Sequence, residues 1–144
     1  EMIIPAASYR FLFQTRLEDA LGPKFLKPEY IRWEKHRVWV VESTLKEGQR
    51  HIYSRRTFYL DEDTWAAVAA DMYDGRGQLW RLQYLYGADL YGRKAGYGSA
   101  YGAYDLLQNI YNLNGKAIPG KYQSGVEQDD KYFTPKGMAR SGVR

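Results

Sequence analysis

Hydrophobic and polar positions alternate most clearly between residues 31 and 86, where β-branched and aromatic side chains dominate. Turn-forming residues interrupt this region at three places, at 46–49, 61–64 and 74–77. Such alternation between regularly spaced turns is typical of antiparallel strands with short connections. The pattern predicts four strands, at 31–45, 50–60, 65–73 and 78–86.

The segment before this region predicts fewer regular elements. Residues 2–13 have the composition of an extended segment, and Pro5 confines that part to a sheet edge or a strand start. Thr15 and Glu18 have the spacing of a capping box, in which the two side chains satisfy the first backbone N–H groups of a helix. We therefore expect one short helix over 15–22.

The segment after this region is rich in tyrosine and glycine between residues 84 and 104. Dense glycine favours loops or bent edge strands, and we expect an insert of this kind at 87–103. Residues 104–113 predict one more strand. Thr134 followed by Pro135 predicts a capped helical turn, because proline suits the first position of a helix.

Composition and charge narrow the class of protein. A chain of 144 residues is one domain's worth of sequence. The absence of cysteine excludes disulfides, thiolate metal sites and cysteine nucleophiles. The net charge of +4 arises from a basic C-terminal segment at 131–144, with four basic residues and no acidic one. The remaining 17 basic and 17 acidic residues cancel (21 minus 4 is 17), so we expect no nucleic-acid partner.

One face of the predicted sheet is strongly aromatic. Turn lengths set the register of the strands, and this register gathers apolar side chains on one face. These are Trp39, Val41, Ile52, Phe58, Leu60, Trp65, Trp80, Leu82 and Tyr84. A patch of this size is seldom left in water, yet the chain predicts only one convincing helix to cover it. The cover must be more sheet, a missing part of the protein, a partner chain or an apolar ligand.

One charged pair lies within this predicted face. Arg56 falls opposite Trp39, with Asp71 diagonally near on the next strand. Burying a lone charge is costly, so the arginine needs a partner. It either stacks on Trp39 and pairs with Asp71, or it anchors the anionic head group of a ligand whose tail lies along the aromatic residues.

Other candidate chemistry is sparse, and no catalytic residue, metal-ligand cluster or cofactor motif stands out. The only histidines, His36 and His51, fall within strands and lack the spacing of a catalytic triad. The acidic run Asp61-Glu62-Asp63 lacks the ligand spacing of a calcium loop, so we expect a hairpin turn there. An enzyme would need a polar cleft with converging acid, base or metal groups, which the sequence does not predict.

Three stretches resemble a family of Gram-negative proteins of unknown function that are labelled outer-membrane lipoprotein-sorting proteins. They are residues 28–42, 50–63 and 71–81, and Tyr132–Arg144 resembles the end of the same family. The family's members are longer, and the matching part is their C-terminal third. The resemblance implies a periplasmic or outer-membrane location. It also implies an unclosed antiparallel half-barrel whose concave apolar face holds acyl chains, without an established catalytic residue.

These observations predict a mainly β, single-domain chain with a curved antiparallel meander sheet. Because an apolar segment begins directly at Met2, we expect a piece of a longer protein, with a processed mature chain as the alternative. The resemblance implies that this piece is the C-terminal part of a half-barrel protein. The predicted function is non-catalytic binding of a lipid or lipoprotein acyl chain in the periplasm or at the outer membrane. The alternative is an interaction module whose aromatic face docks the rest of its own chain or a second copy.

Overall fold

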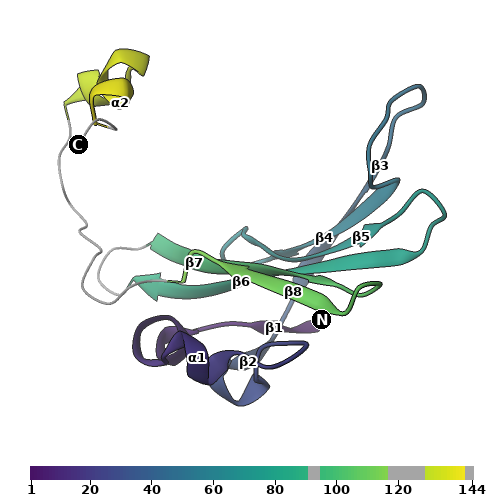
Figure 1. The fold of residues 1–144 in the computed structure, drawn as a ribbon, viewed down its shortest axis with the longest axis horizontal. Coiled ribbons are helices and arrows are strands. Elements are labelled where there is room, and N and C mark those ends of the chain that lie inside the picture. Colours follow the sequence, from purple (N-terminus) through teal and green to yellow (C-terminus); the bar gives the residue numbers. More distant parts are fainter. Residues whose placement is uncertain (91–94, 117–128, 142–144) are drawn as a thin grey trace.

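The computed structural model describes residues 1–90, 95–116 and 129–141, and it is mainly β, as predicted (Figure 1). Six strands form a curved antiparallel sheet in which each strand pairs with its neighbours in sequence. They are β3 (Val38–Thr44), β4 (Arg55–Asp61), β5 (Ala67–Tyr73), β6 (Leu79–Leu90), β7 (Ala95–Asp105) and β8 (Ile110–Asn114). Two further strands, β1 (Met2–Pro5) and β2 (Trp33–His36), pair in a separate ribbon.

The predicted strand at 31–45 is two strands in two sheets. His36 of β2 pairs with Met2 of β1, whereas Val38 of β3 pairs with Asp61 of β4. The chain therefore changes partners at Arg37. The pattern of strand-forming residues continues through this break, so the sequence alone showed no boundary.

The predicted helix at 15–22 is shorter than expected. Residues Arg10–Gln14 form a π-helical turn, η1, and Thr15 closes that turn by donating its hydroxyl to the Arg10 carbonyl at 3.0 Å. Because Thr15 serves the preceding turn, it does not cap a helix. Helix α1 comprises only Leu17–Ala20, and a 3-10 turn, η2, follows at Pro28–Tyr30.

The connections between strands also differ from the prediction. The turn predicted at 46–49 is part of a longer loop between the end of β3 at Thr44 and the start of β4 at Arg55. The glycine-rich insert at 87–103 extends β6 and β7 into a long hairpin, with a register shift between Tyr86 and Gly87. Residues 91–94 of this insert lie outside the described ranges.

The N-terminal segment covers one face of the sheet, which we call the covered face. In Figure 1 it lies along one side of the six strands, below them in this view. Phe11 and Leu12 are fully buried there against Tyr86 and Ala88 of β6. A second cluster joins Ile4 of β1 with Val68 of β5. The main core thus lies between the N-terminal segment and one side of the sheet.

The predicted capped turn near the C-terminus is confirmed. Helix α2 (Pro135–Ser141) begins at the proline, and the Gly137 N–H donates to the Thr134 hydroxyl at 3.1 Å. A 3-10 turn, η3 (Asp130–Phe133), precedes it. Residues 142–144 of the predicted basic tail lie outside the described ranges. Within those ranges, every helix is too short or too polar to span a membrane.

Candidate functional site

The side of the sheet opposite the N-terminal segment carries part of the predicted apolar face. Val41 pairs with Phe58, which pairs with Ala70, and side chains of paired residues point to the same side of a sheet. Trp39 pairs with Leu60 in the same way. We call this side the open face, defined by Trp39, Val41, Phe58, Leu60, Ala70 and Met72.

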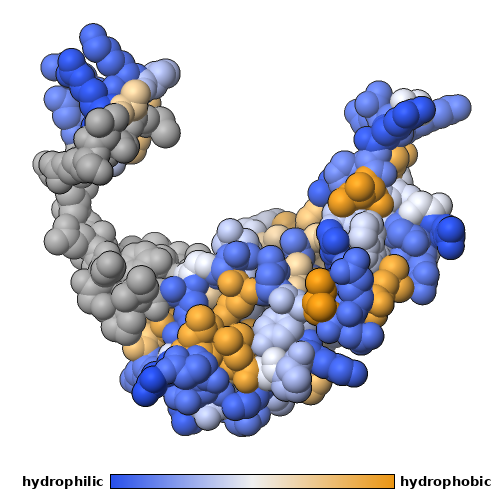
Figure 2. All heavy atoms as spheres, in the orientation of Figure 1, coloured by the Kyte–Doolittle hydropathy of each residue, from blue (hydrophilic) through white to orange (hydrophobic). Residues whose placement is uncertain are grey.

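The open face leaves large apolar side chains in contact with solvent. Trp39 is 53% exposed and Val41 is 45% exposed, while Phe58 and Leu60 are half-buried. None of these four side chains belongs to the two buried clusters that hold the N-terminal segment. Figure 2 shows hydrophobic residues at the surface among hydrophilic ones over β3, β4 and β5. This pattern is typical of a surface that receives a ligand or a partner.

Leu82 and Tyr84 do not belong to the open face, so this part of the prediction is wrong. Leu82 pairs with Asp71 on the covered side, and Tyr84 packs there against Trp33 with ring centroids 6.2 Å apart. The cause is a β-bulge in β5: Tyr59 pairs with Ala69 and Leu60 with Ala67, which leaves Val68 without a partner. Because side chains alternate between the two faces of a sheet, one extra residue in a strand moves each following side chain to the opposite face.

Two tryptophans that were predicted to lie on the apolar face also lie away from the apolar side chains of the open face. Trp65 stands in the turn between β4 and β5, with a positive φ of 59° and 67% exposure. Trp80 falls at a second bulge, and its indole N–H donates to Asp105 at 2.9 Å. The predicted strand register placed both residues with Trp39, but Trp65 precedes the start of β5 and Trp80 falls between the paired residues Leu79 and Arg81.

Arg56 lies on the open face, at the end of its apolar residues. It pairs with Met72, and its guanidinium lies over the Phe58 ring, 5.4 Å from the centroid. The predicted pairing with Asp71 is wrong, because Asp71 points to the covered side and accepts a hydrogen bond from the Tyr59 hydroxyl at 2.7 Å. Within the described ranges, Arg56 has no carboxylate within ion-pair distance. The open face therefore presents a free cation beside apolar side chains.

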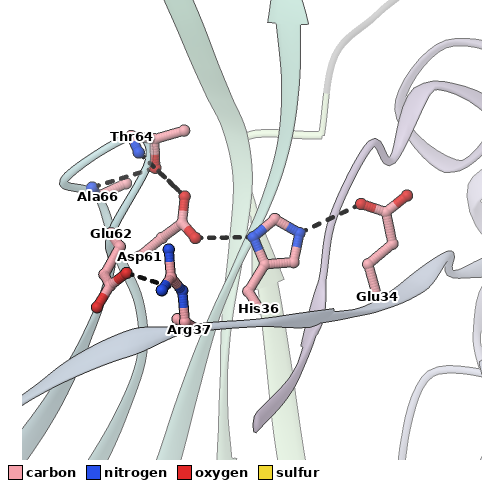
Figure 3. A network of polar contacts seen from close by, with 7 residues as sticks. All are labelled: Glu34, His36, Arg37, Asp61, Glu62, Thr64 and Ala66. Carbon is pink, nitrogen blue, oxygen red and sulfur yellow. Dashed lines mark hydrogen bonds and ion pairs between the residues drawn. The ribbon is translucent and has the colours of Figure 1, made fainter. Parts of the chain in front are cut away.

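A polar network lies at the border between β2 and the sheet (Figure 3). The His36 ring is held between two carboxylates: Asp61 Oδ1 is 2.8 Å from Nδ1, and Glu34 Oε2 is 3.3 Å from Nε2. Asp61 is almost fully buried, and its other oxygen accepts hydrogen bonds from the Thr64 N–H and hydroxyl. Burial lowers the pKa of the His36 imidazole, but both carboxylates outweigh it and raise that pKa above its usual value.

This network borders a pocket of about 260 Å³ between the β1–β2 ribbon and the sheet. His36, Asp61 and Thr64 form a polar wall, and Ile4 and Val68 contribute apolar lining. Among the described residues, the side chains of His36, Asp61 and Asp63 also bring metal-ligating atoms within 4.8 Å of one another. Sequence reasoning missed this cluster because His36 is 25 residues from Asp61 and only the fold joins them.

Comparison with protein families identifies the chain. Residues 1–139 match the family described as "Protein of unknown function (DUF1329)". The chain belongs to this family. An uncharacterized protein of Pseudomonas aeruginosa is 35% identical over 147 aligned residues, which cover all of this chain and 32% of that protein. The chain therefore spans about a third of the length of this relative.

Two solved structures are similar to part of this chain. A DUF1329 family protein from Desulfovibrio piger gives a TM-score of 0.47 at 18% identity, covering 69% of this chain and 40% of that one. A Vibrio parahaemolyticus domain named for outer membrane lipoprotein sorting gives a TM-score of 0.46 at 18% identity, covering 67% and 40%. The family resemblance expected from the sequence is thus confirmed by the match over residues 1–139.

Proposed function

We propose that the open face binds an amphiphile with an apolar tail and an anionic head group, such as a lipid or a lipoprotein acyl chain. The role is binding rather than catalysis, and the place is the periplasm or the outer membrane of a Gram-negative cell. The observation that carries the proposal is the free cation of Arg56 beside exposed apolar side chains on one sheet face.

The apolar part of the open face supports contact with an acyl chain. Trp39 and Val41 on β3 lie beside Leu60 and Phe58 on β4, so the four side chains form a continuous strip. Burying apolar surface contributes about 25 cal/mol per Å², so covering this strip favours binding without any polar contact. Apart from the indole N–H of Trp39, the strip presents hydrocarbon groups, which suits a flexible hydrocarbon tail.

Arg56 supports recognition of the head group. Its guanidinium offers five donors in a planar fork that matches carboxylate or phosphate oxygens. Arg55, the next residue, pairs instead with Glu42 at 2.8 Å and stacks on the Tyr73 ring on the covered side. The two arginines thus share a strand but differ in both face and partner.

The test compares palmitate with hexadecanol, which have tails of equal length and differ in the head group. Binding is followed by tryptophan fluorescence, since Trp39 lies on the open face. We expect palmitate to bind about three- to ten-fold more tightly than the alcohol, as expected for one partly exposed charge pair. Native mass spectrometry of gently purified protein, with lipid analysis of an organic extract, checks for a bound amphiphile.

Matched variants separate the open face from the rest of the sheet. Arg56→Gln should remove the preference for palmitate, while Arg55→Gln on the covered side should keep it. Val41→Gln should weaken binding of both probes, while Val40→Gln, one residue away and facing the other side, should not. Equal binding by all four variants, or no binding by the unmodified protein, would overturn the proposal.

A second candidate is docking of the remainder of a longer chain on the open face. The specific observation in its favour is that this chain covers only 32% of its Pseudomonas aeruginosa relative. In that case native mass spectrometry would give a ligand-free mass, and Val41→Gln would destabilise the longer protein without affecting palmitate. The two candidates thus differ in the effect that they predict for Val41→Gln on palmitate binding.

A further inference from the structure

His36 is held in an arrangement that a neutral imidazole cannot satisfy alone. Each ring nitrogen faces a carboxylate oxygen, Asp61 at 2.8 Å and Glu34 at 3.3 Å. A neutral imidazole carries one N–H, so it donates to only one of these carboxylates. The other nitrogen then turns its lone pair toward a carboxylate oxygen, a contact that needs a second proton or a cation between the two atoms.

A third ligand lies at the same place. Asp63 stands in the exposed turn after β4, and its carboxylate comes within 4.8 Å of the ligating atoms of His36 and Asp61. The neighbouring cation, Arg37, is engaged by Glu62 at 3.1 Å. The cluster therefore combines one imidazole nitrogen with carboxylate oxygens from two residues. A third carboxylate, Glu34, lies on the side of the His36 ring away from Asp61 (Figure 3).

The outer partners already fix the orientation of two of these groups. A neutral ring that carries its proton on Nε2 donates it to Glu34 and leaves the lone pair of Nδ1 toward Asp61, which is the tautomer that binds a metal at Nδ1. Asp61 uses its Oδ2 for the Thr64 N–H at 3.1 Å and the Thr64 hydroxyl at 2.7 Å, which leaves Oδ1 toward the histidine. Hydrogen bonds of this kind orient the ligands in most protein metal sites.

We propose that His36 Nδ1, Asp61 and Asp63 form a binding site for one divalent transition-metal ion, with Zn²⁺ favoured by the ligand set. One imidazole and two carboxylates are ligands that zinc accepts at about 2.0–2.2 Å. Two such ligands of a tetrahedral ion lie roughly 3.4 Å apart, so the 2.8 Å separation of Nδ1 and Oδ1 has to widen slightly. Glu34 and Thr64 are positioning residues.

The ion would join two parts of the fold. His36 belongs to β2 of the N-terminal ribbon, while Asp61 ends β4 of the sheet and Asp63 follows in the turn. Binding to the folded chain alone stabilises it by mass action, so the metal should raise the unfolding temperature. This site does not depend on the open face, since it lies beside the covered side, at the pocket between ribbon and sheet.

The experiment uses the untagged chain, freed of metal with a chelator and titrated with Zn²⁺ by isothermal calorimetry. We expect one ion per chain and a rise in unfolding temperature, with no comparable response to Mg²⁺. Cobalt substitution should give visible absorption bands of a nitrogen- and oxygen-ligated ion. Failure of the unmodified chain to bind Zn²⁺ would overturn the proposal.

Matched variants test the residues. Asp63→Asn should weaken Zn²⁺ binding by about tenfold or more with little change in metal-free stability, because this side chain is exposed. Glu62→Gln, in the same turn, should retain binding. His36→Gln should abolish Zn²⁺ binding. His51→Gln, which changes the only other histidine of the sequence, should leave Zn²⁺ binding unchanged. Zn²⁺ affinity unchanged in Asp63→Asn, or lost in His51→Gln, would contradict the site.

Discussion

At the scale of single residues, Asp105 at the end of β7 is the carboxylate with the most converging donors in the described sheet. The backbone N–H of Gln108 donates to it at 3.0 Å, Arg81 Nε at 3.0 Å and Trp80 Nε1 at 2.9 Å. Burial raises the pKa of the Asp105 carboxyl, but these hydrogen bonds outweigh it and hold that pKa below its usual value. Its ionised form therefore stabilises the fold.

This arrangement makes a prediction about acid stability. A carboxylate with a lowered folded-state pKa stabilises the fold above its unfolded value of about 3.9, and this stabilisation is lost as the pH falls through the lower folded pKa. Asp105→Asn should lower the urea midpoint at pH 7, and its difference from the unmodified chain should shrink as the pH falls below about 4. Asp19→Asn, at an exposed position, is the control. A difference that is independent of pH would contradict this role.

At the scale of elements, the pairing of β7 with β8 depends on a close approach at Gly102. A Cβ at this position would lie 2.6 Å from the backbone oxygen of Asn112, so the two strands would have to separate. Gly102→Ala should cost about 1–3 kcal/mol and raise the hydrogen exchange of β8. Gly75→Ala is the matched control, because a Cβ there meets nothing within 4 Å. Equal unfolding midpoints for the two variants would show that the strands adjust without cost.

At the scale of the whole molecule, β3 is an edge strand of the described sheet with apolar side chains exposed on both faces. Trp39 is 53% exposed on the open face and Val40 is 63% exposed on the other. An unprotected edge of this kind is a template for pairing with another chain. We expect sedimentation velocity to show association that increases with protein concentration. Val40→Lys should suppress it, and a chain that stays monomeric at every concentration would contradict the expectation.

The sequence by itself determined the class of the fold and much of its local structure. Strand-forming residues between turn signals predicted the β class, and Thr134 before Pro135 predicted the start of α2. These signals are local, because propensity, capping and turn chemistry depend on neighbours along the chain. They also placed Trp39, Val41, Phe58 and Leu60 correctly on one face.

Only the tertiary structure decided which other side chains share that face. The bulge at Val68 has no sequence signature, yet it moves Leu82 and Tyr84 to the covered side and separates Arg56 from Asp71. The contact of His36 with Asp61 likewise depends on a change of sheet at Arg37. Register has a period of two residues, so one inserted residue inverts it, and residues distant in sequence meet only through the packing of whole elements.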